Sequence, residues 1–80
     1  MKKKTKEVPS MGIYTSRGAR VEFSDAEAGY PHDQETLKKN KLKLGGVYTV
    51  DEVIVYGFSS TLYLKEFPGI PFNTVNFSNV

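Results

Sequence analysis

The sequence contains no cysteine and no tryptophan, and it has a single histidine. Without cysteine the chain can form neither a disulfide framework nor a thiolate metal site, so packing alone must stabilise a fold of 80 residues. The lack of cysteine also fits the reducing cytoplasm. Because one histidine has no second histidine or cysteine to join it, we expect no zinc site, no other metal and no cofactor.

The sequence also lacks a long apolar run. Its start, 1–6, is rich in lysine like the start of a secretory signal, but Glu7, Val8, Pro9 and Ser10 follow instead of an apolar stretch. No segment approaches the roughly 20 apolar residues that cross a bilayer. We therefore expect a soluble protein of the cytoplasm.

The net charge of +2 is unevenly divided. Residues 1–10 hold four of the 11 basic residues and one of the nine acidic residues, so residues 11–80 hold seven basic and eight acidic residues. We interpret 1–18 as a flexible basic arm and 19–80 as one domain. Because a dedicated nucleic-acid domain usually has a basic face, the nearly neutral body argues against that class.

Alternating apolar residues predict short β-strands, as in Arg20–Asp25, where Val21 and Phe23 share one face. The strands are expected at 20–25, 47–50, 53–56, 61–67 and 72–77. Leu62 and Leu64 alternate with polar neighbours in the fourth strand, and Val75 and Phe77 are expected to face inward in the last. A bend is expected at 51–52, and the prolines of 67–71 are expected to interrupt the chain.

A short helix is predicted between the first two strands. Asp33 stands where a helix cap would stand, and 34–40 has adequate helix propensity. Leu37 and Leu44, seven residues apart, are expected to mark its buried edge. The sequence therefore predicts a mostly β fold, a small and partly open β-barrel with one short helix inserted after the first strand.

Four phrases of the sequence resemble a known family. They are Gly29-Tyr30-Pro31-x-Asp33, Leu44-Gly45-Gly46-x-Tyr48-Thr49-Val50, Leu64-x-Glu66-x-Pro68-Gly69 and Phe72-Asn73-Thr74-Val75-x-Phe77. Together they resemble small proteins with SH3-like barrels that are encoded by phages and prophages. The resemblance covers about 20–78 and implies an SH3-like fold in a viral or mobile-element setting; it carries no catalytic motif.

Three polar phrases fall at expected loop ends, and in a small barrel such loops can converge on one rim. The candidate ligand-binding residues are Tyr30, His32, Asp33, Ser59, Ser60, Thr61, Phe72, Asn73 and Thr74.

Each polar candidate has two interpretations. His32 can donate a proton or bind a ligand phosphate, or it can be an exposed loop residue. Asp33 is either a helix cap or a chemical group, and the hydroxyls of 59–61 either donate to an anion or simply belong to a turn. Asn73 either contacts a ligand or satisfies nearby backbone groups.

The exposed aromatic residues and the lysines offer further contacts. Outward-facing tyrosines can stack on a base or dock a peptide. Four lysines can contact phosphates, or they can form the solvated face of a helix: Lys38, Lys39, Lys41 and Lys43.

Three functional hypotheses follow. The first is a viral accessory protein of the anti-defence type, which neutralises a host factor in the host cytoplasm by binding a host protein or by sequestering a small nucleotide-like signal. The second is a nucleic-acid-binding module that uses the lysine arm and exposed aromatic rings. The third is an assembly protein that pairs through a sheet edge, including with a second copy. An enzyme is the least favoured class, because the sequence offers few groups for acid–base or nucleophilic chemistry.

Overall fold

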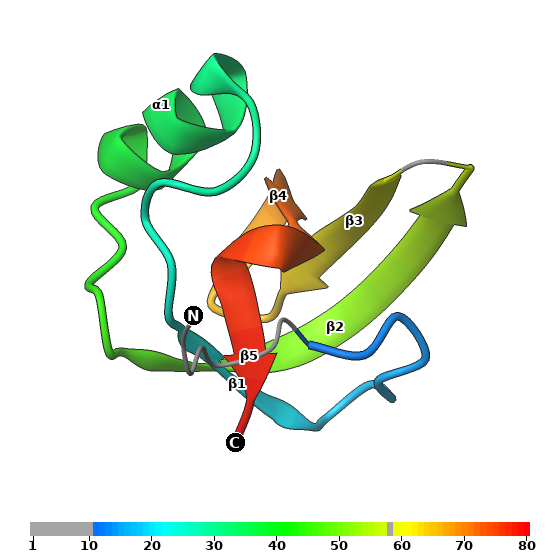
Figure 1. Ribbon diagram of the computed structural model, residues 1–80. Coiled ribbons are helices and arrows are strands. Elements are labelled where there is room, and N and C mark those ends of the chain that lie inside the picture. The colour runs from blue at the N-terminus through cyan, green and yellow to red at the C-terminus, as the bar shows by residue number, and fades with distance from the viewer. Residues whose placement is uncertain (1–10, 58) are drawn as a thin grey trace, which may run out of the picture.

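The computed structural model describes residues 11–57 and 59–80, which form an antiparallel sheet and one short α-helix (Figure 1). The sheet has five strands in the order β4-β3-β2-β1-β5. The elements are β1 (Arg20–Phe23), α1 (Pro31–Lys39), β2 (Val47–Tyr56), β3 (Ser59–Leu64), β4 (Phe67–Asn73), the 3-10 helix η1 (Thr74–Asn76) and β5 (Phe77–Asn79). The expected mostly β fold, with one short helix after the first strand, is confirmed.

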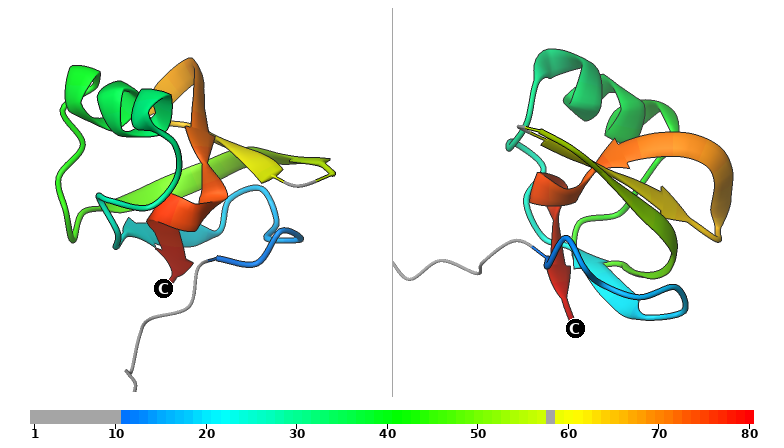
Figure 2. Two further views of the ribbon diagram at one scale, coloured as in Figure 1. Left: turned by 45° about the horizontal axis from the view of Figure 1, so that its top comes forward. Right: turned by 90° about the vertical axis from the view of Figure 1, so that its right-hand side faces the viewer.

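The long strand β2 joins the two halves of the sheet. β1 pairs only with its first part, from Val47 to Thr49, whereas β3 pairs along it as far as Tyr56. The register with β3 shifts between Val50 and Glu52. The two strands expected at 47–50 and 53–56 are therefore wrong, because β2 runs through both without a break. The bend expected at 51–52 is a β-bulge inside this strand, and such a bulge bends and twists its strand. Figure 2 shows the resulting curved sheet, with α1 at the end of the molecule away from the C-terminus.

The core contains one continuous cluster of apolar side chains. Its buried members are Met11, Val21, Phe23, Leu37, Val50, Leu62, Leu64, Phe72 and Phe77. Phe77 lies at its centre, with ring centroids 5.7 Å from Phe23 and 6.0 Å from Phe72. The inward faces expected from strand alternation, Val21 with Phe23 and Leu62 with Leu64, are confirmed.

Two expected core positions are wrong. Leu44 is 65% exposed, because the helix ends at Lys39 and Lys41 then adopts a left-handed φ of 58°, so the helical spacing from Leu37 does not continue. Val75 is 39% exposed because it lies in η1, where the two-residue alternation of a strand does not apply.

The prolines of 67–71 do not interrupt the sheet, contrary to the expectation. β4 is an edge strand that pairs with β3 alone, so a proline there need not remove a hydrogen bond of the ladder. The pairing aligns Thr61 with Asn73 and Leu62 with Phe72. It thus brings the end of β4 beside the start of β3.

The expected arm, 1–18, is described only from Met11 onward. Met11 is 3% exposed, and its amide donates to the carbonyl of Phe77 at 2.7 Å. Gly18 donates its amide to Val50 at 2.8 Å. Residues 11–18 therefore contact the sheet at both ends. Within the described ranges no helix is long and apolar enough to cross a membrane.

Candidate functional site

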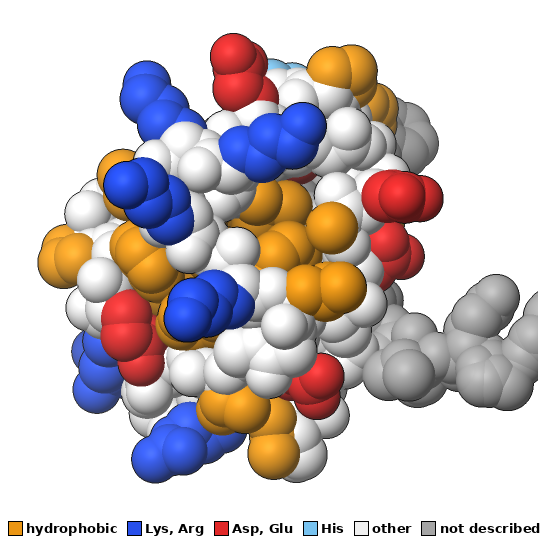
Figure 3. All heavy atoms as spheres, turned by 90° about the vertical axis from the view of Figure 1, so that its left-hand side faces the viewer, with side chains coloured by type: hydrophobic (Ala, Val, Ile, Leu, Met, Phe, Trp, Pro, Cys, Tyr) orange, Lys and Arg blue, Asp and Glu red, His pale blue; other side chains and the backbone are white. Residues whose placement is uncertain are grey.

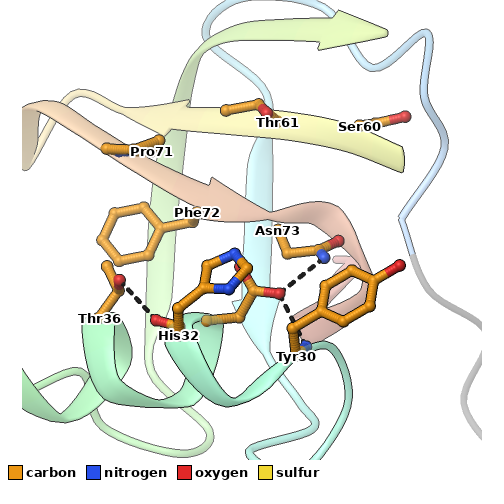
Figure 4. A pocket seen from close by; sticks show the side chains of 9 residues that line it. Tyr30, His32, Thr36, Ser60, Thr61, Pro71, Phe72 and Asn73 are labelled. Carbon is orange, nitrogen blue, oxygen red and sulfur yellow. Dashed lines mark hydrogen bonds and ion pairs between the residues drawn. The ribbon is translucent and has the colours of Figure 1, made fainter. Parts of the chain in front are cut away.

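A pocket of about 310 Å³ lies between the start of α1 and the strands β3 and β4 (Figure 4). The helix and the residue before it contribute one wall, and the two strands contribute the other. The lining residues are Tyr30, His32, Asp33, Thr36, Ser60, Thr61, Pro71, Phe72 and Asn73.

The helix wall begins three residues earlier than the sequence predicted. Pro31 occupies the first helical position, where its fixed φ suits the helix and its missing N–H is not needed. Asp33 is therefore not the cap residue but the third residue of the helix. Its carboxylate still caps the helix, because Oδ2 accepts from the Tyr30 amide at 2.9 Å.

The same carboxylate connects the helix to the sheet. Asp33 Oδ2 also accepts from Asn73 Nδ2 at 3.0 Å, and Asn73 Oδ1 accepts from the amide of Val75 at 3.1 Å. Both side chains are largely buried. In the structure Asp33 and Asn73 thus have the structural roles that the sequence left open, helix capping and satisfaction of backbone groups, and they hold the two walls together.

The loop before the helix is held by a buried asparagine. Asn76 is fully buried, and its Nδ2 donates to the carbonyls of Asp25 at 2.7 Å and Ala28 at 3.0 Å. This contact fixes the end of the loop from which Gly29 turns into Tyr30. Gly29 has φ of 86°, and a Cβ there would lie 2.9 Å from Asp33 Oδ2, so the approach requires glycine.

Two exposed rings stand at the mouth of the pocket. Tyr30 and His32 stack with their centroids 5.7 Å apart and an angle of 8° between the planes. The Tyr30 residue is 57% exposed and the His32 side chain is 76% exposed, and His32 Nε2 lies 3.5 Å from Asp33 Oδ1. Figure 4 shows both rings on the helix side, facing the strands. They are the lining groups most available to a ligand.

The strands supply small and polar groups around a buried ring. Ser60 and Thr61 come from β3, and Pro71 and Phe72 come from β4. Phe72 is 3% exposed and belongs to the core, so this wall is rigid. Asp33 is the only carboxylate among the lining residues, and His32 is the only lining side chain that can become cationic.

The structure brings seven of the nine expected ligand-binding residues together in this lining. These are Tyr30, His32, Asp33, Ser60, Thr61, Phe72 and Asn73. Thr74 is buried in η1 and is not a lining residue. The side chain of Ser59 lies outside the described part of the chain.

Sequence reasoning missed Thr36 and Pro71. Thr36 lies four residues after His32, and its hydroxyl donates to the His32 carbonyl at 2.9 Å. In a helix that starts at Pro31, residues four apart lie on one face, so His32 predicts that Thr36 lies beside it. The expected helix start at 34 left His32 outside the helix, and the spacing was therefore not used. Pro71 was assigned to an interruption, although it belongs to β4.

The candidate basic residues lie elsewhere. Lys38 and Lys39 are in the last turn of α1, and Lys41 and Lys43 follow in the loop; all four are exposed. None of them lines the pocket, so the structure separates the expected ligand residues from the expected basic contacts. In residues 11–57 and 59–80, no three histidine, aspartate or glutamate side chains gather in a way that could hold a metal ion.

One carboxylate outside the pocket has a shifted pKa. Partial burial raises the pKa of Glu66, but hydrogen bonds from the backbone amides of Thr49 and of Glu66 itself, with the nearby charge of Arg20, lower it more. The pKa of Glu66 therefore lies below its ordinary value. Both carboxylate oxygens accept from the Thr49 amide, at 2.9 and 3.1 Å.

The fold and the site define a small, mostly β protein with one short helix and a polar pocket between that helix and the sheet. Residues 13–80 match the family model described as bacteriophage T4 protein Y07B, and the chain belongs to this phage protein family. Comparison with the curated proteins and with the solved structures gave no match. The expected phage setting is thus confirmed, whereas the SH3-like classification stays a prediction.

Proposed function

We propose that the chain is a non-enzymatic phage accessory protein that neutralises a host factor by binding a host protein at the pocket between α1 and the strands β3 and β4. The observation that carries this proposal is the exposed Tyr30–His32 stack beside a rigid wall of Ser60, Thr61 and Phe72. A concave site with exposed aromatic rings and a few polar groups is typical of recognition.

Between a host protein and a nucleotide-like signal, the charges favour the protein. The Asp33 carboxylate already occupies the positive end of the helix, where a ligand phosphate would otherwise bind. No lysine or arginine lines the pocket. A phosphate would therefore meet the Asp33 carboxylate with no lysine or arginine beside it. A neutral or basic side chain of a partner protein suits this lining better.

The size of the pocket supports the same choice. Its volume of about 310 Å³ lies at the lower end of the range of roughly 300–1,000 Å³ for small-molecule sites. One or two inserted side chains fill such a space. The stacked rings then supply the surrounding contact area.

A binding role is also supported over a catalytic one. The Nε2 of His32 lies near Asp33, but within the described chain no hydroxyl makes a hydrogen bond to the His32 ring. None of the lining hydroxyls, on Thr36, Ser60 and Thr61, is thus hydrogen-bonded to this histidine as an activated nucleophile would be. His32 is better suited to stacking and hydrogen bonding.

The other two hypotheses have less support. None of the lysines of 38–43 lines the pocket with Tyr30, so the pocket lacks the basic groups that hold a nucleic-acid backbone. For assembly through an edge, β4 carries Pro68 and Pro71, and β5 has only three residues. Proline and short length both disfavour pairing of an edge strand.

The test compares two tyrosine variants, Tyr30→Ala at the pocket and Tyr56→Ala as the control. Tyr56 is 55% exposed on β2 and does not line the pocket. Affinity purification from host lysate, quantified by mass spectrometry, should give a protein retained by the wild type and by Tyr56→Ala but lost with Tyr30→Ala. Its affinity for Tyr30→Ala should be about tenfold or more lower when both proteins are purified, as expected for an aromatic anchor.

A thermal-shift series with nucleotides tests the alternative that the pocket binds a nucleotide-like signal. We expect no stabilisation by ATP or by cyclic mono- and dinucleotides. If a nucleotide stabilises the wild type and Tyr56→Ala but not Tyr30→Ala, the ligand of the pocket is a nucleotide and not a host protein. Equal retention of every host protein by both variants would contradict a binding role for the pocket.

A further inference from the structure

A second hollow, which we call the leucine groove, lies beside the later part of α1. It has a volume of about 180 Å³ and is lined by Phe23, Ala26, Gln34, Leu37, Lys38, Leu42 and Leu44. Figure 3 shows this side of the molecule, where apolar side chains gather among basic side chains, with acidic side chains further out on the same face. The groove shares no residue with the pocket that holds Tyr30.

The groove combines a fixed floor with an exposed rim. Leu37 and Phe23 are 4% and 3% exposed and belong to the core, whereas Leu44 is 65% exposed. Gly45, directly after Leu44, has a positive φ of 87°. Such exposed apolar surface is stabilised when another apolar group covers it.

The lining of the groove carries a positive charge. Lys38 is the only charged residue in its lining, and Lys41 and Lys43 alternate with Leu42 and Leu44 along the loop. None of these lysines, nor Lys39, forms an ion pair with another residue in the part of the chain described here. The ammonium group of Lys38 in an otherwise uncharged and largely apolar lining complements an acidic partner with an apolar anchor.

We propose that the leucine groove binds an acidic segment of a partner protein. One large apolar side chain of this segment enters between Leu37, Leu42 and Leu44, and neighbouring carboxylates lie near the lysines. The volume of about 180 Å³ suits a single leucine or phenylalanine side chain. This binding site is independent of the function proposed for the pocket.

The lining favours a peptide over the other partners that lysines attract. Bases of a nucleic acid stack on exposed rings, but the one ring of the groove, Phe23, is buried. Membrane binding requires an apolar face that protrudes into the lipid, whereas these side chains surround a hollow. A protruding apolar side chain among carboxylates matches both the shape and the charge.

The test is an NMR titration of the ¹⁵N-labelled chain with synthetic peptides. The probe has a central leucine flanked by aspartate and glutamate residues. One control peptide replaces the leucine with alanine, and another replaces the acids with lysine. We expect the acidic leucine peptide to shift the amides of 37–44, the alanine peptide to bind about tenfold more weakly, and the lysine peptide not to bind.

Matched variants locate the binding. Leu44→Ala and Lys38→Glu should each weaken the acidic peptide about tenfold. Val55→Ala and Lys65→Glu change an exposed apolar residue and an exposed lysine outside the groove, so they should have little effect. Tyr30→Ala should also leave this affinity unchanged, which separates the groove from the pocket. Thermal melts of all variants verify that they fold.

Several results would overturn the proposal. One is the absence of shifts at 37–44 with the acidic leucine peptide, and another is equal binding of the alanine peptide. A third is stronger binding of a DNA duplex or of phosphatidylglycerol vesicles at the same amides, which would assign the lysines to phosphate groups. Equal losses of peptide affinity with Lys38→Glu and Lys65→Glu would mean that the net charge of the protein attracts the peptide and that the groove does not bind it specifically.

Discussion

Asn73→Ala is the substitution that best tests how the pocket is held together. Asn73 makes two hydrogen bonds with different parts of the fold. Its Nδ2 donates to Asp33 at the start of α1, and its Oδ1 accepts from Val75 in η1. Asn73 is only 9% exposed, so water cannot easily replace either bond. The alanine variant therefore removes this hydrogen bond between the helix and the sheet, and it removes the cap of η1.

The expected loss follows from these two bonds. A hydrogen bond to a charged group contributes about 1.5–3 kcal/mol, and a capping side chain contributes about 1 kcal/mol. We expect Asn73→Ala to lower the free energy of unfolding by about 2–4 kcal/mol. For a domain of this size, 1 kcal/mol corresponds to about 4–8 °C, so the melting temperature should fall by about 10–30 °C.

The assay is urea and thermal unfolding followed by circular dichroism, with Asn79→Ala as the control. The Asn79 side chain also makes two hydrogen bonds, with Gly12 at 2.8 Å and Thr15 at 3.0 Å, but it is exposed. We expect the control to lose less than about 1 kcal/mol, because water replaces exposed bonds. Equal losses for the two variants, or a loss below about 1 kcal/mol for Asn73→Ala, would refute the assigned role of burial.

Two further predictions concern backbone and charge. Gly29→Ala should destabilise the protein by about 1–3 kcal/mol more than Gly45→Ala in urea unfolding. Both glycines have a positive φ, but only at Gly29 would the new Cβ meet Asp33, at 2.9 Å. Equal losses of stability in the two variants would contradict this reason. Glu66→Gln should lower stability by about 1 kcal/mol or less at pH 7, since Glu66 is largely exposed. Because the pKa of Glu66 is lowered in the folded state, the extra stability of the wild type over Glu66→Gln should disappear as the pH falls through that pKa, below 4.5. Thermal melts in which the two proteins keep a constant difference in stability as the pH falls would contradict this.

The strands were predictable where one face of the sheet is buried and the other face is more exposed. Val21 and Phe23 alternate with charged neighbours, and this alternation alone identifies the buried face. The same reasoning failed after Asn73, because η1 inserts a helical turn before β5 and resets the alternation. A three-residue turn leaves no periodic signal in the sequence.

The residues of the pocket were predictable, but their contacts were not. Each polar phrase lies at the end of an element, which is why Tyr30 and Asn73 could be chosen from the sequence. Their proximity depends on the register that aligns Asn73 with Thr61, and on the bond from Asn73 to Asp33. Both are long-range contacts, and no local propensity specifies them. The sequence also assigned Asp33 to the wrong helical position, because Pro31 already starts the helix.

The boundary of the folded unit gives the last prediction, Met11→Ala. The composition of 1–18 suggested a flexible basic arm, because charge patterns identify solvated segments well. Composition cannot identify a single apolar residue that packs into a distant core. Met11 is 3% exposed within the core cluster, and its amide bonds to Phe77.

Because Met11 is part of the core, its truncation should cost about 2–4 kcal/mol, as for other buried methionines. Tyr14→Ala is the matched control from the same segment, since Tyr14 is 87% exposed and should change stability by about 0.5 kcal/mol or less. Urea unfolding of the two variants distinguishes the boundaries. A small loss in both would place the boundary after residue 18, as composition suggests. A large loss of stability with Met11→Ala alone means that the folded unit includes residues 11–18. Met11 can contribute to the core only if the segment that joins it to β1 is also held against the sheet.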